Sequence, residues 1–346
     1  MTLYNPVKIG SLKLPGNLFL APVAGYTDRA FRSLCVEEGA NFSFTELVSA
    51  ESLYRKPENY GLGNPDGDPM SKIKPLAANL IKRGEKEKHY AIQLFGSVPE
   101  SIYKAAILLA PLAPDVLDIN AGCPVHKITK NGAGSALMRD PSNLGKIVEE
   151  AVRASREYLG NIPVTIKIRS GWDSKSLNYA ECARIAVEAG AAMISLHPRT
   201  RSQNYSGISD WSHIKDLVSR LSVPVAGSGD LYTPEDAQRM LTETGCSAVM
   251  FARGAMGNPF IFRTTRSLLT RGKWEPVPLP ERLNTALSHL KLLAVDIGEH
   301  TACLEMRKQF CAYSKGFVGG ASLRNALVHA ETIADFCRII NTATGR

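Results

Sequence analysis

Several short apolar runs in this sequence end in a polar side chain that could do chemistry. Gln93, Lys167 and His197 each close such a run, and burying these groups without a partner is costly. Each one alone has a structural interpretation: a satisfied core amide, half of an ion pair, or a hydrogen-bonded interior histidine. Their joint placement at the ends of consecutive runs favours a functional site. The other residues at these ends are Pro22, Val23, Ala24, Thr45, Glu46, Asn120, Cys123, Arg169, Ala252 and Arg253.

Two glycine-containing turns close the last two runs. They are Gly227-Ser228-Gly229-Asp230 and Ala252-Arg253-Gly254. Glycine lets backbone N–H groups approach an anion, and an arginine adds positive charge. The two turns predict a phosphate site, which fits a phosphosugar and a flavin mononucleotide equally well.

The runs that carry these residues have the length and composition of buried parallel strands. Eight of them alternate with amphipathic segments across about 250 residues, the size of a closed (β/α)8 barrel. An open doubly wound sheet is the alternative, but no GxGxxG follows the first run. We therefore expect an α/β fold of the TIM-barrel type. The expected strands are Leu18–Ala21, Phe42–Glu46, Tyr90–Phe95, Val116–Asn120, Val164–Arg169, Ala192–His197, Val223–Gly227 and Ala248–Ala252. The clearest expected helices are Asp28–Glu38, Pro99–Leu109, Pro141–Tyr158, Tyr179–Ala189, Trp211–Leu221 and Pro234–Thr244.

The second of the eight units is the least regular. Between Tyr54 and His89 the chain contains Pro57, an Asn-Pro-Asp-Gly turn and a charged stretch typical of solvated surface. We expect an elaborated loop here, with a helix near Ala77–Lys82.

The pattern of the sequence changes after Pro259. A proline-rich stretch from Trp274 to Pro280 is typical of a stiff linker, and helical spacing without a strand follows it. We expect three helices, Glu281–Ile297, Ala302–Phe317 and Leu323–Ile340, in a small all-α bundle. The predicted organisation is a barrel domain over 1–262, a linker over 263–280 and a helical domain over 281–346.

Positive charge is concentrated in the tail. The chain has a net charge of +8; residues 263–346 hold 12 Lys and Arg against 7 Asp and Glu, and residues 1–262 hold 29 against 26. A basic module joined to a nearly neutral one points to a polyanionic partner, commonly nucleic acid. Solubility alone is the alternative explanation.

The remaining composition is typical of a soluble globular protein in a reducing compartment. Apolar residues make up 44% of the chain and charged residues 21%. Seven scattered cysteines without a CxxC pair argue against a disulfide framework. No membrane-spanning run and no signal peptide are evident. We expect a cytoplasmic monomer with no membrane partner and no metal.

Several segments resemble the tRNA-dihydrouridine synthases. The most specific runs from Asp118 to Lys127, contains Asn120-Ala121-Gly122-Cys123-Pro124, and is followed by a glycine-rich turn over Asn131–Met138. The resemblance covers essentially the whole chain in the right order. The further similar segments are Ala21–Asp28, Ala91–Gly96, Lys167–Trp172 and His197–Arg201.

The resemblance implies an FMN-dependent oxidoreductase that uses NADPH. Hydride would pass from flavin N5 to C6 of a uridine, Cys123 would protonate C5, and 5,6-dihydrouridine would form. A thiol suits this role, because its ordinary pKa near 8.5 leaves it mostly protonated at neutral pH. Lys167 near the N1/C2 edge of the ring would stabilise the reduced flavin anion. The implied FMN-binding residues are Pro22, Val23, Ala24, Gln93, Lys167, His197, Ser228, Gly229, Asp230, Ala252 and Arg253.

The resemblance also implies a tRNA substrate whose uridine is flipped out of the stack. Asn120 would hydrogen-bond the uracil edge, and Arg169 and Arg199 would contact the RNA backbone. Basic tail residues with an interleaved tyrosine suit phosphate contact and stacking, and an ordinary basic helix face is the alternative. The tail residues concerned are Arg307, Lys308, Lys315 and Arg324.

Four positions depart from the family. Ser228 stands where Asn is usual and Ala252 where Gly is usual, and both lie in the phosphate turns. In the tail, Gln309 and Ala312 replace residues that are commonly His and Trp. The first two changes affect the predicted FMN phosphate site, and the other two affect the RNA contacts.

Two other functions compete with this one. A flavin barrel acting on a free pyrimidine or on dihydroorotate would leave the basic tail and the Asn120–Pro124 motif unexplained. A flavin-free RNA-binding protein with the same fold would have no use for Cys123, Lys167 and Gln93.

Overall fold

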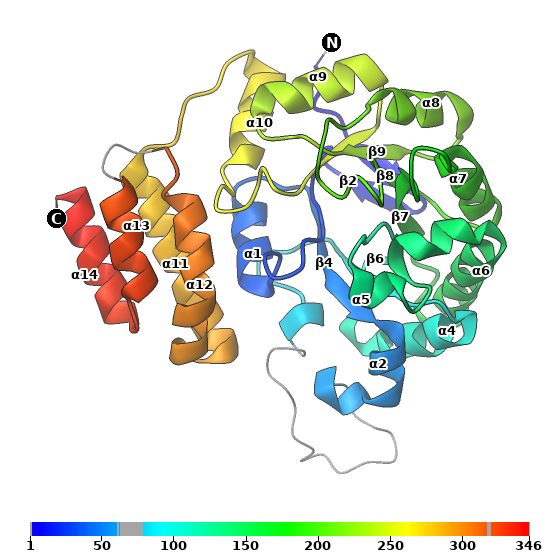
Figure 1. Cartoon of the computed structure of the whole chain (residues 1–346), viewed down its shortest axis with the longest axis horizontal. Helices are drawn as coiled ribbons and strands as arrows, with labels where there is room; N and C mark the ends of the chain where they lie inside the picture. The colour runs from blue at the N-terminus through cyan, green and yellow to red at the C-terminus, as the bar shows by residue number, and fades with distance from the viewer. Residues whose placement is uncertain (1, 61, 63–78, 317–319, 346) are drawn as a thin grey trace.

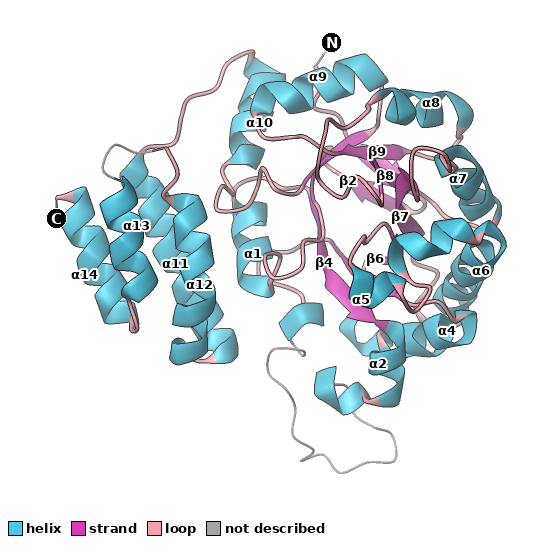
Figure 2. Ribbon diagram, in the orientation of Figure 1, coloured by secondary structure: helices cyan, strands magenta, loops and turns pink. Residues whose placement is uncertain are grey.

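The computed structural model describes residues 2–60, 62, 79–316 and 320–345. Within them, eight parallel strands close into a barrel in the order β10-β3-β4-β5-β6-β7-β8-β9, with helices packed around the outside (Figures 1 and 2). The predicted TIM barrel is confirmed. The strands are β3 (Leu18–Leu20), β4 (Phe42–Ser49), β5 (Tyr90–Phe95), β6 (Val116–Ala121), β7 (Val164–Gly171), β8 (Ile194–Thr200), β9 (Val225–Ser228) and β10 (Ala248–Phe251).

Local sequence signals start several of the surrounding helices. Asp28 and Asp140 cap α1 and α6 by accepting hydrogen bonds from backbone N–H groups of the first turn. Thr233 and Asp236 form a capping box at the start of α9. The outer helices are α1 (Arg29–Glu37), α2 (Ala50–Arg55), α4 (Pro99–Leu108), α6 (Pro141–Tyr158), α7 (Tyr179–Glu188), α8 (Ser212–Arg220), α9 (Pro234–Thr244) and α10 (Ile261–Arg271), with the short segments α5 (His126–Thr129), η1 (Pro57–Tyr60), η2 (Ala110–Leu112) and η3 (Gly134–Arg139).

A short antiparallel hairpin precedes the barrel and was not predicted. It pairs β1 (Val7–Ile9) with β2 (Leu12–Leu14). Its buried side chains join a cluster that includes Phe19 and Phe42 from the barrel strands. Each strand has only three residues, too few for an alternating pattern to stand out in the sequence.

Strand β4 is longer than predicted and irregular. Its register against β5 shifts between Phe44 and Leu47, as in a β-bulge. The shift falls at Glu46 and Leu47, whose side chains line two different cavities. Half of the elaborated loop predicted between Tyr54 and His89 lies outside the described residues; of the helix expected near Ala77–Lys82, residues 79–81 are helical.

The C-terminal region is helical, as predicted, but its boundaries differ. Four described helices replace the three expected ones: α11 (Leu279–Ile297), α12 (Glu299–Tyr313), α13 (Gly320–His329) and α14 (Ile333–Thr344). The expected third helix is broken because Thr332 and Asp335 form a capping box that starts α14. Within the predicted linker, α10 continues to Arg271, since Ile261, Phe262 and Leu269 are buried in the barrel core.

The helical region packs on the barrel beside α1 (Figure 1). Ala30 of α1 and Phe260 lie in the same buried cluster as Leu290 and Phe310. Arg29 forms an ion pair with Asp296. None of the described helices is both long and apolar enough to span a bilayer.

Candidate active site

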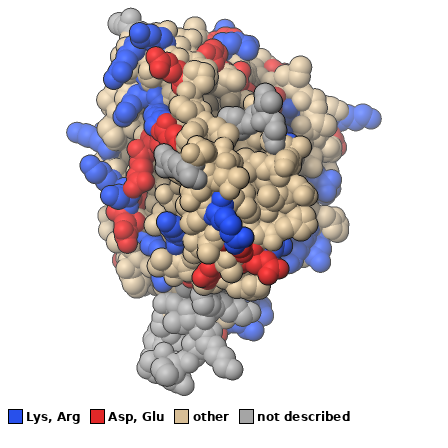
Figure 3. Space-filling model, turned by 90° about the vertical axis from the view of Figure 1, so that its left-hand side faces the viewer, with Lys and Arg blue, Asp and Glu red and all other residues tan. Residues whose placement is uncertain are grey.

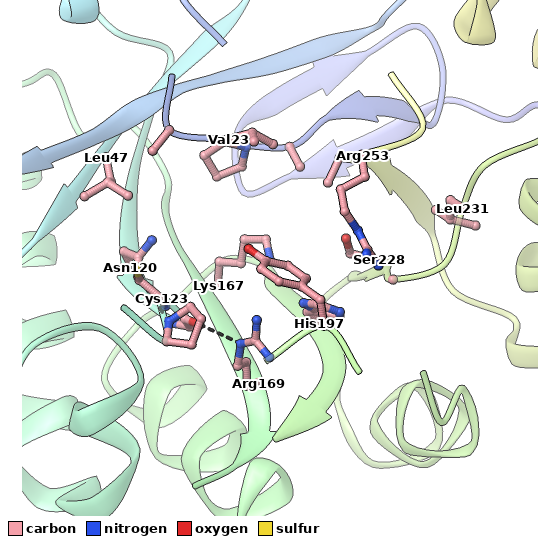
Figure 4. A pocket seen from close by; sticks show the side chains of 18 of the residues that line it. Val23, Leu47, Asn120, Cys123, Lys167, Arg169, His197, Ser228, Leu231 and Arg253 are labelled. Carbon is pink, nitrogen blue, oxygen red and sulfur yellow. Dashed lines mark hydrogen bonds between the residues drawn. The ribbon is translucent and has the colours of Figure 1, made fainter. Parts of the chain in front are cut away.

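A cavity of about 300 Å³ lies at the C-terminal ends of the barrel strands. Figure 4 shows Cys123, Lys167 and His197 gathered around it, with Val23 across from them. The strand register explains this arrangement, because Asn120 lies beside Lys167 and Arg169 beside His197. The predicted residues that line it are Pro22, Val23, Ala24, Asn120, Cys123, Lys167, Arg169, His197, Ser228, Gly229, Asp230, Ala252 and Arg253.

The loop that carries Cys123 is held by hydrogen bonds to its backbone. The N–H of Cys123 donates to Asn120 Oδ1 (2.9 Å), and its carbonyl accepts from the N–H and the hydroxyl of Ser135 (3.0 and 2.9 Å). Arg169 Nε donates to the carbonyl of Gly122 (2.8 Å). The thiol takes no part in these hydrogen bonds. The loop therefore positions the cysteine through its backbone and leaves the thiol available for reaction.

Burial favours the neutral thiol form of Cys123. Burial raises its pKa above the ordinary value, although the backbone at Val125 and the charges of Arg169 and Lys167 oppose the shift. The same two cations would stabilise the thiolate left after a proton is given up. The group is therefore suited to act as a general acid.

Lys167 is a cation with a lowered pKa. Burial and the neighbouring Arg169 lower its pKa to about 8, and Asp118 opposes the shift. Burial in turn raises the pKa of Asp118 to about 6, while hydrogen bonds from Gln93 and Thr165 oppose that shift. The lysine thus stays mainly charged at neutral pH, with Asp118 as a buried counter-charge.

Gln93, predicted to lie at the flavin ring, is fully buried and is not among the residues that line the cavity. It pairs in register with Asp118, two residues deeper in the barrel than Asn120. Its Nε2 donates to Asp118 Oδ2 (2.7 Å), and its Oε1 accepts from Asn120 Nδ2 (2.8 Å). Gln93 therefore connects the residue that holds the cysteine loop to the counter-charge of Lys167.

His197 is neutral in this site. Burial and the positive charges of Lys167, Arg169, Arg199 and Arg253 hold its pKa well below its ordinary value. A neutral imidazole can donate one hydrogen bond and accept another. It is thus available as a polar group that adds no further positive charge.

The turns after β9 and β10 meet at Asp230. Its carboxylate accepts from Arg199 (2.8 Å) and from Arg253 (3.2 Å). The guanidinium of Arg253 also lies over the rings of Tyr205 and Tyr232, 4.9 and 5.3 Å from their centroids. Arg253 is therefore held at the cavity, where it can meet an anion.

The phosphate turn has little room for larger residues. Gly229 has φ +103°, and a Cβ there would lie 2.5 Å from Ser209 Oγ and 2.8 Å from His197 Cδ2. Ser228, one of the family departures, donates its hydroxyl proton to the carbonyl of Met250 (3.0 Å). The hydroxyl at this position is thus used to connect β9 with β10.

Two arginines predicted to contact the RNA backbone are instead buried. Arg169 and Arg199 are each 2% exposed. Arg169 donates to the carbonyls of Gly122, Thr200 and Asn204, and Arg199 donates to two carbonyls and to Asp230. Both guanidinium groups are committed to holding the loops of the barrel mouth, because a buried arginine must satisfy its donors locally.

The predicted tail residues divide into two pairs. Arg307 donates to the carbonyl of Ala330 (3.1 Å) and Arg324 to that of Ser314 (3.2 Å), so these two hold the helices together. Lys308 and Lys315 are exposed. The face shown in Figure 3 carries both Lys and Arg and Asp and Glu, with a broad uncharged area between them.

Several lining residues were not predicted. They include Leu47, Tyr205, Leu231 and Tyr232, and Asp118 lies just beneath the cavity. Tyr205 and Tyr232 lie in loops, where hydrophobic periodicity gives no signal. Each follows a strand that contains a predicted site residue: Tyr205 follows β8 with His197, and Tyr232 follows β9 with Ser228. Among the described residues, no cluster of His, Cys, Asp and Glu is suited to hold a metal ion.

Comparisons with known proteins identify the family of this chain. The family model "Dihydrouridine synthase (Dus)" matches residues 19–344. The chain belongs to the dihydrouridine synthase family. The family predicted from the sequence, and with it an enzyme, is confirmed.

Relatives of the chain cover nearly its whole length. It is 48% identical to the probable tRNA-dihydrouridine synthase of Treponema pallidum, over 99% of this chain and 97% of the relative. It is 33% identical to tRNA-dihydrouridine synthase B of Pasteurella multocida, over 92% and 90%. The chain and its relatives therefore share both the barrel and the helical region.

Solved structures show the same fold at low identity. A complex of 2-naphthoyl-CoA reductase matches with a TM-score of 0.57 at 11% identity, covering 79% of this chain and 52% of the other. An old yellow enzyme homologue from Zymomonas mobilis matches with a TM-score of 0.52 at 13% identity, covering 80% and 94%. At these identities the likeness extends to the fold alone.

Proposed function

We propose that this dihydrouridine synthase family member reduces the C5=C6 bond of a uridine in tRNA, with bound FMN as cofactor and NADPH as reductant. Family membership supports the reaction and the substrate class. The observation that carries the proposal is the Cys123 loop, which presents a protonated thiol to a cavity that also contains Lys167.

The residues of the cavity fit FMN. Pro22, Val23 and Ala24 form one wall, and Lys167 and His197 offer polar groups to the ring system. Arg253 and the backbone of Gly229 and Asp230 would hold the phosphate. When bound, FMN supplies the hydride that adds to C6 of the uracil ring.

Lys167 stabilises negative charge in the cavity. With its pKa at about 8, the ammonium form predominates at neutral pH. Fixed positive charge in a site shielded from water is a strong source of electrostatic stabilisation. His197 can accept or donate a hydrogen bond beside it without raising the positive charge.

Cys123 supplies the proton for C5. The thiol gives its proton to C5 as hydride adds to C6, so the double bond becomes a single bond and a thiolate remains. Arg169 and Lys167 stabilise that thiolate. Solvent then returns the proton to the sulfur, and the site is ready for another turnover.

Asn120 can still meet the uracil ring. Its Oδ1 is taken by the N–H groups of Gly122 and Cys123, and one proton of Nδ2 is donated to Gln93. The second proton of Nδ2 is available for a uracil carbonyl. Asn120 thus orients the base and positions the acid through the same side chain.

The uridine must leave the RNA stack to enter this cavity. We propose that the barrel performs the chemistry and that the helical region, from α11 onward, contacts the tRNA through exposed lysines such as Lys308 and Lys315. A cytoplasmic location and a monomeric state stay predictions.

An absorbance experiment tests the proposal. The purified protein should show flavin bands between 350 and 500 nm that NADPH bleaches and unmodified tRNA restores. Bands that NADPH bleaches but tRNA does not restore would exclude tRNA as substrate and favour a small-molecule dehydrogenase. A colourless protein that cannot be reconstituted with FMN would refute the cofactor assignment.

A further inference from the structure

A second cavity of about 300 Å³ lies between the barrel and the helical region. It is formed by the loop after β3, the end of β4 and helices α1, α11 and α12. It is a direct neighbour of the active site: Ala24 and Leu47 line the active-site cavity, whereas Gly25 and Glu46 line the second one. The described lining residues that are exposed are Gly25, Glu305 and Lys308.

Gln309 offers this cavity an acceptor without a donor. The residue is 2% exposed, and no described residue donates a hydrogen bond to its Oε1. A buried acceptor left unpaired destabilises the free protein.

Glu46 offers a second acceptor. Its Oε2 accepts from the N–H of Gly25 (2.7 Å), and no described residue donates to its Oε1. Burial raises the pKa of Glu46 to about 7, and the hydrogen bond from Gly25 opposes the shift. Glu46 and Gln309 can therefore both accept hydrogen bonds from the N–H groups of a ligand.

Lys308 provides the donor of this cavity. Its Nζ is paired with Glu305 (2.5 Å) and lies 5.5 Å from the centroid of Tyr26, in the loop that separates the two cavities. The other cation, Arg29, is already bound to Asp296 through two nitrogens. Leu80, Leu293 and Ile297 supply apolar walls for a flat group.

We propose that this cavity binds an unpaired guanine of the tRNA, near the uridine that is reduced. The Glu46 carboxylate accepts from guanine N1–H and N2–H, Gln309 accepts the other N2 proton, and Lys308 donates to O6. This inference rests on the proposed function, because it takes RNA as the substrate.

Guanine fits better than the other bases for a simple reason. Its Watson–Crick edge alone presents two adjacent N–H donors beside an acceptor, whereas the edges of adenine, cytosine and uracil each present a single donor group beside one or two acceptors. The cavity is lined by Glu46 and Gln309, each with an Oε1 to which no described residue donates, and by one lysine. A phosphate group would instead meet Glu46 and Glu305 and be repelled.

Single guanosine-to-inosine replacements in a tRNA transcript test the proposal, since inosine lacks the N2 amine. At one unpaired position, inosine should raise the Kd of the FMN-loaded enzyme about tenfold. Glu46→Gln should raise the Kd of the unmodified transcript by a similar factor, and the same inosine should then add nothing further. Gln309→Met should show a smaller loss at the same position.

A control variant and two contradicting results complete the test of guanine binding. Glu188→Gln removes one exposed carboxylate on α7, far along the barrel from the helical region, and should leave Kd unchanged. Inosine transcripts that all bind within twofold of the parent, or effects of inosine and Glu46→Gln that multiply, would overturn the inference. Dihydrouridine formed by the wild-type enzyme in either case would leave the proposed function standing, and its absence would refute that function instead.

Discussion

The loop of residues 21–28 separates two cavities of opposite charge. Among their described lining residues, the active-site cavity has three Lys and Arg against one carboxylate, and the second has four carboxylates against two Lys and Arg. The first set is Lys167, Arg169, Arg253 and Asp230. The second is Asp28, Glu46, Asp296, Glu305, Arg29 and Lys308.

The opposite charges of the two cavities suit different parts of one polyanionic substrate. Positive charge in the active site favours an anionic cofactor and the negative charge that develops during reduction. Carboxylates in the second cavity repel phosphate and favour the donor groups of a base. The chemistry and the selection of the substrate are thereby kept on opposite sides of one loop.

Removing the acid should have the largest effect. We expect Cys123→Ala to lower dihydrouridine formation by about 100-fold or more, with the flavin spectrum unchanged, because the loop is held through backbone atoms. Single-turnover analysis of tRNA measures this, with Cys311→Ala in α12 as the control. A Cys123→Ala enzyme with wild-type turnover would remove this residue as the acid.

Replacing the buried Arg199 at the mouth of the barrel should have the second largest effect. Arg199→Met leaves Asp230 without its bidentate partner, and we expect a loss of about 3 kcal/mol in the free energy of unfolding. Urea unfolding measures it. Arg239→Met, which removes an exposed pair with Glu243, should cost less than about 0.5 kcal/mol. Equal losses would show that burial does not distinguish the two arginines.

Removing the counter-charge Asp118 should shift the pH dependence of the rate of flavin reduction. The ammonium form of Lys167 assists flavin reduction, so the rate should fall as pH rises through about 8, the pKa of Lys167. Asp118 raises that pKa, so Asp118→Asn should lower it and move the fall to lower pH. Rapid-mixing measurements of flavin bleaching by NADPH across pH 6 to 10 would show this. Superimposable profiles would separate Lys167 from the reduction step.

The smallest effect should come from an exposed lysine of the helical region. Lys315→Ala should weaken tRNA binding about twofold and make the slope of log K against log salt shallower by about one. Titrations at several salt concentrations measure both quantities. Lys215→Ala on α8 is the matched control, and an equal change in that variant would mean that the effect is one of net charge.

Much of the barrel could be predicted because its signals are local. The apolar run Tyr90–Phe95 and the helices Pro141–Tyr158 and Pro234–Thr244 have the predicted bounds, since composition, proline and capping residues set them within a few residues. The hairpin β1–β2 was missed because three-residue strands carry too little pattern. The prediction of a single helix over Leu323–Ile340 was wrong. The apolar spacing is continuous, but a capping box at Thr332 and Asp335 starts a new helix within that range.

The sequence by itself determined which chemistry is available: a thiol between Gly122 and Pro124, a lysine and a histidine at strand ends, and two glycine turns. Tertiary structure alone decided what each group is free to do. Gln93 is hydrogen-bonded to Asp118 and Asn120, and Arg169 and Arg199 donate hydrogen bonds to loop carbonyls. The physical reason is that burial and partners depend on strand register and loop closure, which join residues far apart in the chain.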